Sequence, residues 1–213
     1  MSAALRAEVA EVYRDLVRLG MNTGSAGNVS ARTRRGMVIT PTGASAETVD
    51  AKSLVPMALD GAVRKGKALP SSEWAMHAAI YAADPRAGAI VHTHADACTA
   101  LACLNEGLPA FHYMIAAFGG ADVRCAPYVT FGTPRLAAAA AEAIAGRSAC
   151  LLANHGMIVH APTPRGALRA AVALETLCRQ YLLARAAGAV RLLTGEEMDA
   201  ALRRFATYAA GRG

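Results

Sequence analysis

The apolar positions along the chain follow two spacings, one typical of helices and one typical of strands. Residues 3–19 place apolar side chains at helical spacing and are followed by Gly20, a residue type that commonly closes a helix. Short apolar runs at 29–32, 37–40 and 54–59 are separated by turn-forming residues and predict strands. The first part of the chain therefore predicts a helix followed by several strands.

The middle of the chain predicts a helix that leads directly into a strand. A proline and two serines, which favour a helix start, precede a helix expected over 72–83; an Asp-Pro pair then ends it. The apolar run at 88–94 predicts the strand. Because residues two apart on a strand point the same way, we expect His92 and His94 to lie side by side, with Glu73 nearby.

The remaining patterns are mostly helical. Helices are expected over 96–104, 134–145, 164–187 and 194–208, and strands over 123–126, 150–153 and 157–160. Residues 112–120 fit neither pattern. We therefore expect a single α/β domain over residues 1–213, with a sheet covered by helices.

Composition narrows the class of protein and its compartment. Hydrophobic residues make up 54% and charged residues 18%, as in a globular protein. No apolar run reaches the roughly 20 residues that span a bilayer, and the first residues do not form a secretory signal, so we expect no membrane association. The five cysteines are odd in number and include no Cys-x-x-Cys pair, which favours free thiols in the cytoplasm.

The charge balance favours anionic ligands. The net charge is +6 and the pI is about 9.3. The basic residues are scattered and aromatic residues are only 5%, so a phosphorylated small molecule is a better expected partner than nucleic acid. Arg32, Arg34 and Arg35 are expected to form a solvated turn.

The histidine pair is a candidate metal site. Imidazole nitrogens and carboxylate oxygens are ligands that zinc takes in tetrahedral geometry, so Glu73, His92 and His94 form a plausible set. A His-x-His pair also occurs by chance, and a third ligand would strengthen the case; His155, after an apolar strand, is the candidate. His77 shares a helical face with Glu73 and could be a rival ligand, although a supporting or packing role is favoured.

Small residues gather in two loops that could hold a phosphate. The loops at 23–28 and 40–45 are rich in glycine, serine and threonine, and glycines let backbone N–H groups approach an anion. The predicted helix start at Ser71 and Ser72 offers more donors of the same kind. One such loop is usually a simple turn, but the three features together favour phosphate.

These motifs together resemble the class II (zinc) aldolase/adducin family. The resemblance rests on Gly24-Ser-Ala-Gly-Asn-Val-Ser30, Ile39-Thr-Pro-Thr-Gly43, Leu69-Pro-Ser-Ser-Glu73, Val91-His-Thr-His94, His112-Tyr-Met-Ile-Ala-Ala117, Ala126-Pro-Tyr-Val-Thr-Phe-Gly-Thr133 and Asn154-His-Gly156. It implies a central, mostly antiparallel sheet covered by helices on both faces. It also implies a homotetramer in a fourfold ring, with its sites at the subunit interfaces.

The resemblance implies a role for each motif. His92, His94, His155 and Glu73 would bind one metal ion per subunit, Zn²⁺ or alternatively another divalent transition metal, and Glu73 would also be the acid/base. The phosphate would be held by Gly27, Asn28, Thr42, Gly43, Ser71 and Ser72. Tyr113 would be a catalytic tyrosine reaching a neighbouring subunit's site, and Tyr208 a second catalytic tyrosine on a weaker alignment.

The implied reaction is reversible cleavage of a ketose 1-phosphate, of the L-fuculose 1-phosphate type, to dihydroxyacetone phosphate and a short aldehyde such as lactaldehyde. Zinc is a Lewis acid that can spread the charge left on carbon. Alternatives are an aldolase for 5-deoxyribulose 1-phosphate or 5-methylthioribulose 1-phosphate, or a sugar-phosphate epimerase or dehydratase of the same family. A non-enzymatic, adducin-like module is disfavoured by the histidine and glutamate set.

Overall fold

The protein is built on one seven-stranded sheet. The computed structural model describes residues 2–64 and 68–210, apart from the side chains of 208–210. The strands are β1 (Asn28–Thr33), β2 (Gly36–Ile39), β3 (Val55–Met57), β4 (Ala89–Thr93), β5 (Cys125–Ala126), β6 (Ala149–Leu152) and β7 (Gly156–Ala161), in the order β3-β2-β1-β4-β7-β6-β5. All neighbours are antiparallel except β5 and β6, so the expected mostly antiparallel sheet is confirmed.

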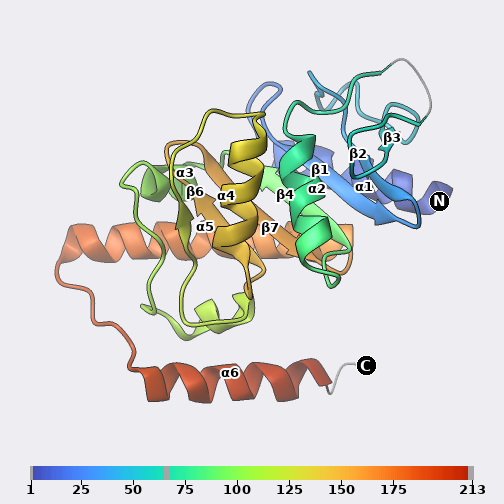
Figure 1. Ribbon diagram of the computed structural model, residues 1–213. Helices are drawn as coiled ribbons and strands as arrows, with labels where there is room; N and C mark the ends of the chain where they lie inside the picture. Colours follow the sequence, from blue (N-terminus) through green and yellow to red (C-terminus); the bar gives the residue numbers. More distant parts are fainter. Residues whose placement is uncertain (1, 65–67, 211–213) are drawn as a thin grey trace.

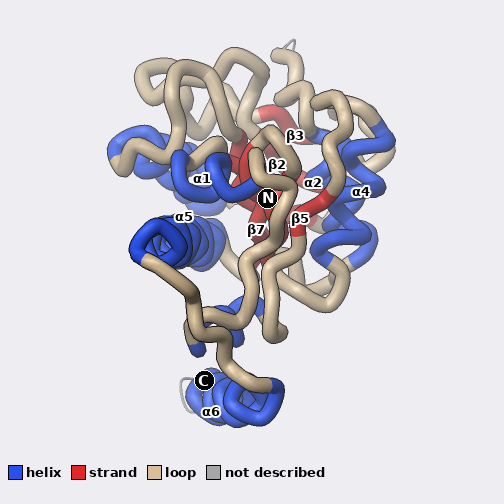
Figure 2. Tube along the Cα trace, turned by 90° about the vertical axis from the view of Figure 1, so that its left-hand side faces the viewer, coloured by secondary structure: helices blue, strands red, loops and turns tan. Residues whose placement is uncertain are grey.

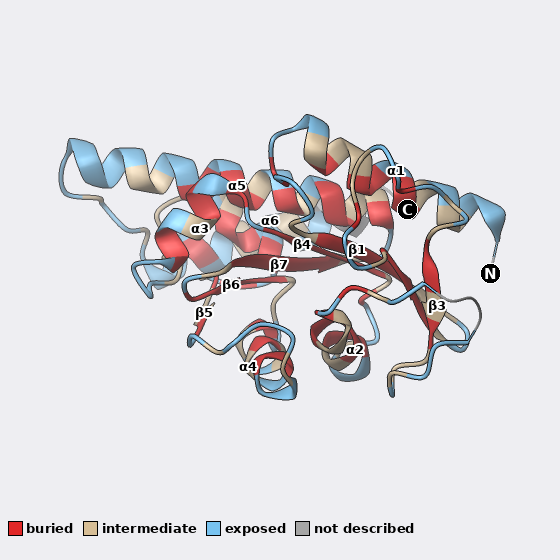
Figure 3. Cartoon of the chain, turned by 90° about the horizontal axis from the view of Figure 1, so that it is seen from above, coloured by how far each residue is buried: buried red, intermediate tan, exposed pale blue. Residues whose placement is uncertain are grey.

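Helices cover both faces of this sheet. They are α1 (Ala3–Arg18), α2 (Trp74–Ala83), α3 (Asp96–Ala102), α4 (Pro134–Ile144), α5 (Pro164–Ala187) and α6 (Gly195–Ala210). Figure 1 shows their order along the chain, and Figure 3 shows α1, α3 and α5 above the sheet with α2 and α4 below it. Among the described residues, no helix is both long enough and apolar enough to cross a bilayer.

The central strands are apolar on both faces because each face has its own hydrophobic core. Val91 and Val159 pack with α1, α3 and α5, whereas Ile90 and Ile158 pack with α2 and α4. This explains why the strands read as continuous apolar runs rather than as an alternation. His92 lies two residues after Ile90 and therefore faces the α2 side of the sheet.

The residues at 112–120, which fit neither pattern, form the short 3₁₀ helix η1 (Tyr113–Phe118). His112 precedes it and caps it, with its Nδ1 accepting from the Met114 N–H at 3.2 Å. In Figure 2, α6 lies beyond the helix and sheet layers. It packs against η1. Phe205 of α6 stacks on Tyr113, with ring centroids 6.4 Å apart.

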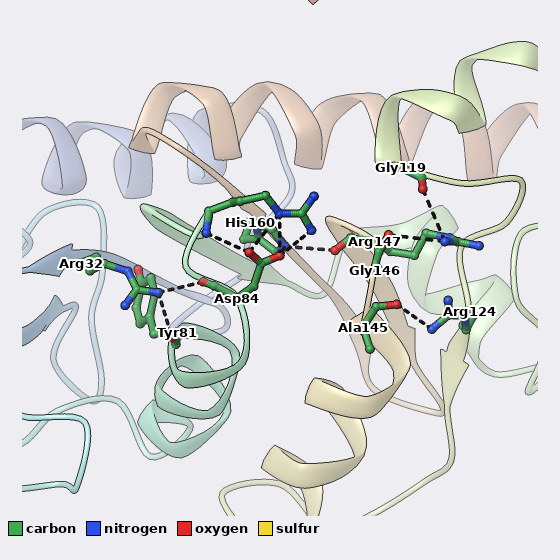
Figure 4. Close-up of polar contacts among 10 residues, drawn as sticks. Arg32, Tyr81, Asp84, Gly119, Arg124, Ala145, Gly146, Arg147 and His160 are labelled. Carbon is green, nitrogen blue, oxygen red and sulfur yellow. Dashed lines mark hydrogen bonds and ion pairs between the residues drawn. The ribbon is translucent and has the colours of Figure 1, made fainter. Parts of the chain in front are cut away.

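The expectation for Arg32 is wrong. Its guanidinium donates to the carbonyls of Tyr81 and Asp84 (Figure 4). It also donates to the Ala87 carbonyl and lies 4.7 Å from the centroid of the Tyr81 ring. The last carbonyls of a helix lack partners within it, and Arg32 on β1 satisfies those at the end of α2. Arg34 and Arg35 are exposed as expected.

Candidate active site

Three imidazoles meet where β4 and β7 come together. His92 lies on β4, His94 just after it, and His155 in the turn between β6 and β7. The Nε2 atoms of His92 and His94 are 3.0 Å apart, which confirms that the two side chains lie side by side. The three ring centroids are 4.8–4.9 Å from one another, so the rings surround a common point.

Close packing of the backbone brings His155 to this point. A Cβ atom on Gly156 would stand 2.4 Å from the carbonyl oxygen of Thr93 and 3.1 Å from a carbon of the His94 ring. Only glycine therefore permits the two chain segments to approach so closely. Asn154, the preceding turn residue, takes the left-handed conformation with φ 53°, which asparagine tolerates better than most residues.

Glu73 completes the cluster from the start of α2. Its Oε2 is 3.0 Å from His92 Nε2, its Oε1 is 3.2 Å from His155 Nε2, and the residue is 7% exposed. Burial alone would raise the pKa of this carboxyl, but the imidazoles of His92 and His155 hold it far below its usual range. Glu73 is therefore an ionised carboxylate inside a ring of histidines.

The donor set fits a divalent metal. The four side chains offer ligand atoms that all lie within 4.8 Å of one another. His92 Nδ1 is 2.8 Å from the carbonyl oxygen of Met157 and must donate to it, which leaves the Nε2 lone pair facing the cluster. Tetrahedral zinc with Zn–N bonds of 2.0–2.1 Å separates its ligands by about 3.3 Å, close to the observed spacings.

Two further observations agree with a bound cation. The Oε1 atom of Glu73 is buried and accepts no hydrogen bond from the described part of the chain. Burial and the neighbouring imidazoles of His92 and His155 lower the pKa of His94 to about 4, so its ring is neutral and able to ligate. A cation at the centre would satisfy the oxygen and all the inward lone pairs.

A cleft of about 370 Å³ opens beside this cluster. All the residues expected to hold phosphate line it: Gly27, Asn28, Thr42, Gly43, Ser71 and Ser72. Two backbone hydrogen bonds hold the loops together, from Thr42 N–H to the Leu69 carbonyl and from Ser71 N–H to the Thr40 carbonyl, each 3.0 Å. The helix start is itself shifted: α2 begins at Trp74, because the residues from Ser71 to Glu73 form a turn in which Ser71 Oγ accepts from the Glu73 N–H.

The side chain of Asn28 lines the cleft and also contacts Glu73 and His77. It is 3% exposed; its Nδ2 lies 3.1 Å from Glu73 Oε2 and its Oδ1 lies 2.5 Å from His77 Nε2. His77 is therefore one contact away from the cluster and is not among the grouped ligand atoms. This agrees with the favoured supporting role for His77.

The two candidate catalytic tyrosines lie outside this cleft or outside the described side chains. Tyr113 is 54% exposed on η1 and does not line the cleft. Tyr208 belongs to α6, and its side chain lies outside the described part of the chain. Two aromatic residues that sequence reasoning left without a role, Tyr128 and Phe131, do line the cleft and are 63% and 65% exposed. The sequence feature that could have indicated these two residues is a pair of aromatic side chains in a loop of small residues.

The sequence pattern of one family extends over most of the chain. The family described as Class II Aldolase and Adducin N-terminal domain matches residues 7–182. The chain belongs to this family. L-fuculose phosphate aldolase of Escherichia coli is 43% identical over 205 residues, covering 96% of this chain and 95% of that protein. The 5-methylthioribulose-1-phosphate/5-deoxyribulose-1-phosphate aldolase of Rhodospirillum rubrum is also 43% identical, over 96% of this chain and 92% of its own.

A solved structure agrees with these relatives. One titled L-fuculose 1-phosphate aldolase superposes with a TM-score of 0.92 at 39% identity, covering 96% of this chain and 97% of its own. The protein is a class II aldolase, and therefore a lyase, of the fuculose-phosphate or methylthioribulose-phosphate type. The cluster of Glu73 and three histidines equips this class II aldolase to hold a divalent metal.

Proposed function

We propose that the protein is a zinc-dependent aldolase that cleaves a ketose 1-phosphate of the L-fuculose 1-phosphate type to dihydroxyacetone phosphate and a short aldehyde. The observation that carries the proposal is the position of a metal-capable cluster at one side of a cleft whose other side is built from phosphate-binding loops. One substrate molecule can therefore contact the metal-capable cluster and the phosphate-binding loops at the same time. The relatives named above act on substrates of this type.

The phosphate would occupy the loop side of the cleft. The hydroxyls of Ser71 and Ser72 can donate to it, and the glycines at 27 and 43 leave room for backbone N–H groups to approach. This contact is remote from the bond that breaks, so its binding energy is available to hold the reacting carbons beside Glu73. The net charge of +6 favours entry of an anionic substrate.

Glu73 would move the proton at the carbon next to the carbonyl. A zinc ion held by His92, His94 and His155 would supply Lewis-acid stabilisation of the negative charge that develops on the substrate. The Glu73 carboxylate is ionised and buried in the cluster, so it can accept a proton from that carbon in synthesis and return it in cleavage. Its place beside the imidazoles positions it for this transfer.

A tyrosine would handle the proton of the substrate's other reacting hydroxyl. Tyr113 is exposed and lies outside its own subunit's cleft, so we propose that it serves the cleft of a neighbour in a homotetramer. An exposed aromatic side chain at this position suits a subunit contact. Tyr208 is a second candidate for the same task.

The five free thiols support a reducing, cytoplasmic compartment.

A salvage substrate is the second candidate, because the relative named for 5-methylthioribulose 1-phosphate and 5-deoxyribulose 1-phosphate is as similar to the chain as the fuculose relative. The test is a product screen with the metal-loaded protein. L-fuculose 1-phosphate, 5-deoxyribulose 1-phosphate and 5-methylthioribulose 1-phosphate are compared by kcat/KM, with dihydroxyacetone phosphate detected through NADH-coupled reduction. Release of that product supports the aldolase, and the ranking identifies the substrate. Epimerised or dehydrated products without dihydroxyacetone phosphate would overturn the proposed aldolase activity.

A further inference from the structure

A row of buried polar side chains leads from the protein interior to Glu73. Tyr81 Oη is 2.8 Å from Ser30 Oγ, Ser30 Oγ is 2.7 Å from His77 Nδ1, and His77 Nε2 is 2.5 Å from Asn28 Oδ1. Asn28 Nδ2 then lies 3.1 Å from Glu73 Oε2. Buried polar groups are costly unless paired, and here the whole row is paired from end to end.

Burial is nearly complete along the row. Ser30 and His77 are 0% exposed, Tyr81 is 1% exposed and Asn28 is 3% exposed. Ser30 and Asn28 come from β1, whereas His77 and Tyr81 come from α2, one helical turn apart. The row thus joins the sheet to α2, the helix that Glu73 directly precedes, and no water-exposed group interrupts the row.

The atoms that face one another give the direction of each hydrogen bond in the row: Asn28 Nδ2 lies next to Glu73 Oε2, and Asn28 Oδ1 lies next to His77 Nε2. An amide nitrogen only donates and an amide oxygen only accepts, so Asn28 donates to Glu73 and accepts from His77. His77 Nε2 must then carry the hydrogen. Burial lowers the pKa of His77 to about 3, so the ring is neutral and has only that one hydrogen.

The same argument extends to the other end of the row. With its hydrogen on Nε2, His77 can only accept at Nδ1, so the Ser30 hydroxyl donates to it. Ser30 has then used its one hydrogen, and the Tyr81 hydroxyl donates to Ser30 Oγ. Arg32 lies 4.7 Å from the centre of the Tyr81 ring and holds that ring in place. The four donors therefore all point toward Glu73.

We propose that His77 is a positioning residue, which through its Nε2–H holds the Asn28 amide with its N–H facing Glu73. In the opposite orientation, the amide oxygen of Asn28 would face the Glu73 carboxylate at 3.1 Å and repel it. His77 thereby keeps the Glu73 carboxylate directed at the histidine cluster. The inference rests on the proposed role of Glu73 in proton transfer, but the geometry concerns metal binding as well.

Two substitutions at one position separate donation from packing. In His77→Gln, the side-chain amide nitrogen can occupy the place of Nε2 and still donate to Asn28. In His77→Leu, the volume stays filled but no donor remains. Tyr81→Phe is the matched control, because it removes one buried hydroxyl and keeps the ring beside Arg32, while Ser30 can still donate to His77.

The first readout is metal affinity, measured by competition with a zinc chelator. Groups that orient metal ligands from outside typically contribute about 10- to 100-fold in affinity or activity. We expect His77→Leu to weaken zinc binding and lower kcat by about that factor, with a much smaller change in KM for the phosphorylated substrate. His77→Gln should recover most of both losses, and Tyr81→Phe should stay within about threefold of the wild type. Equal losses in the Leu and Gln variants, or unchanged zinc affinity and kcat in His77→Leu, would overturn the proposal.

The second readout is the tautomer of His77, measured by nitrogen NMR of histidine-labelled wild-type protein. The His77 signals are assigned by their absence in His77→Gln. A neutral ring with hydrogen on Nε2 is expected; hydrogen on Nδ1 would overturn the proposal even if the Leu variant fails to fold. Neither the NMR nor the chelator competition uses a substrate. If the wild type cleaved no ketose 1-phosphate, the proposed function would fail while these two measurements still judged the role of His77.

Discussion

Replacing Gly27 by alanine should impair the phosphate side of the cleft through a steric conflict that the structure locates. Gly27 has φ 75°, in the left-handed region, and a Cβ atom added there would stand 2.3 Å from Asn22 Oδ1 and 2.7 Å from Asn22 Cγ. Asn22 is 4% exposed and cannot swing into solvent. The loop must therefore shift, and Gly27 lines the cleft.

Gly24 provides the matched control for backbone strain. It has φ 61° in the same loop, a Cβ atom there would meet nothing within 4 Å, and it does not line the cleft. The left-handed conformation costs an alanine roughly 1–2 kcal/mol at either position. Overpacking against Asn22 should add roughly 1–3 kcal/mol to the loss of unfolding free energy in Gly27→Ala alone.

The effect on binding follows from the hydrogen bonds to the phosphate. A hydrogen bond to a charged group contributes about 1.5–3 kcal/mol, and 1.4 kcal/mol corresponds to about tenfold in affinity. If the shift of the loop loses one such bond, KM for the phosphorylated ketose should rise roughly 10- to 100-fold in Gly27→Ala. In Gly24→Ala it should change by less than about threefold.

The assay combines urea unfolding with steady-state kinetics on both variants. The double variant Asn22→Ala/Gly27→Ala removes the steric conflict but keeps the strained φ. Its unfolding free energy should return close to that of Gly24→Ala, since the side-chain amide of Asn22 has no hydrogen-bond partner in the described part of the chain to lose. If Gly27→Ala matched Gly24→Ala in both stability and KM, the steric argument would be refuted.

Four other predictions concern the metal cluster and its surroundings. His92→Ala should abolish both activity and stoichiometric zinc, so elemental analysis that found undiminished zinc would contradict the ligand assignment. Glu73→Gln should keep the fold and lose roughly two to four orders of magnitude in deuterium exchange into dihydroxyacetone phosphate; exchange at the wild-type rate would exclude the proton-transfer role. Since the pKa of His77 is about 3 in the folded protein and 6.5 in a free side chain, the unfolded chain binds more protons between these pH values, and this group's contribution to stability is lost as pH falls below 6.5. Urea unfolding of the metal-free protein at pH 7 and pH 5 should therefore show about 2 kcal/mol more acid destabilisation in the wild type than in His77→Gln, and equal pH dependence would count against a neutral buried His77. Finally, mixed oligomers of Tyr113→Phe and Glu73→Gln should recover part of the activity that each lacks; no recovery, despite proof by mass spectrometry that subunits had mixed, would mean that each chain supplies both groups to its own site.

The helices and central strands could be predicted from the sequence because their signals are local. The spacing of apolar residues in α1 and α5 reports which face of the helix is buried, and it does so without reference to a partner. The start of α2 differs from the expected position: the helix begins at Trp74 rather than Ser72, because the residues before it form a turn in which Ser71 Oγ accepts from the Glu73 N–H. The parallel pairing of β5 with β6 could not be predicted, because a strand as short as β5 carries no sequence pattern that identifies its partner or its direction.

The candidate metal site was also accessible from the sequence in part. His92 and His94 are two residues apart, so the geometry of a single strand brings them together. Glu73 and His155 come from distant segments, and only the pairing of β4 with β7 and the packing of α2 bring them within reach. The resemblance to the family indicated Glu73 and His155 because it rests on sequence motifs, which identify residues without any knowledge of the distances between them.

Tertiary structure alone decided how the supporting polar groups are used. Arg32 looked like part of a solvated turn, but it satisfies the carbonyls at the end of α2. Asn28 lines the cleft as expected of a phosphate-binding residue, and the packing of β1 on α2 also joins its side chain to His77 and Glu73. Periodicity reports whether a residue is buried, whereas a hydrogen-bond partner 45 or 49 positions away is set by how strand and helix pack. The sequence determined which chemical groups were available, and packing determined which of them face one another.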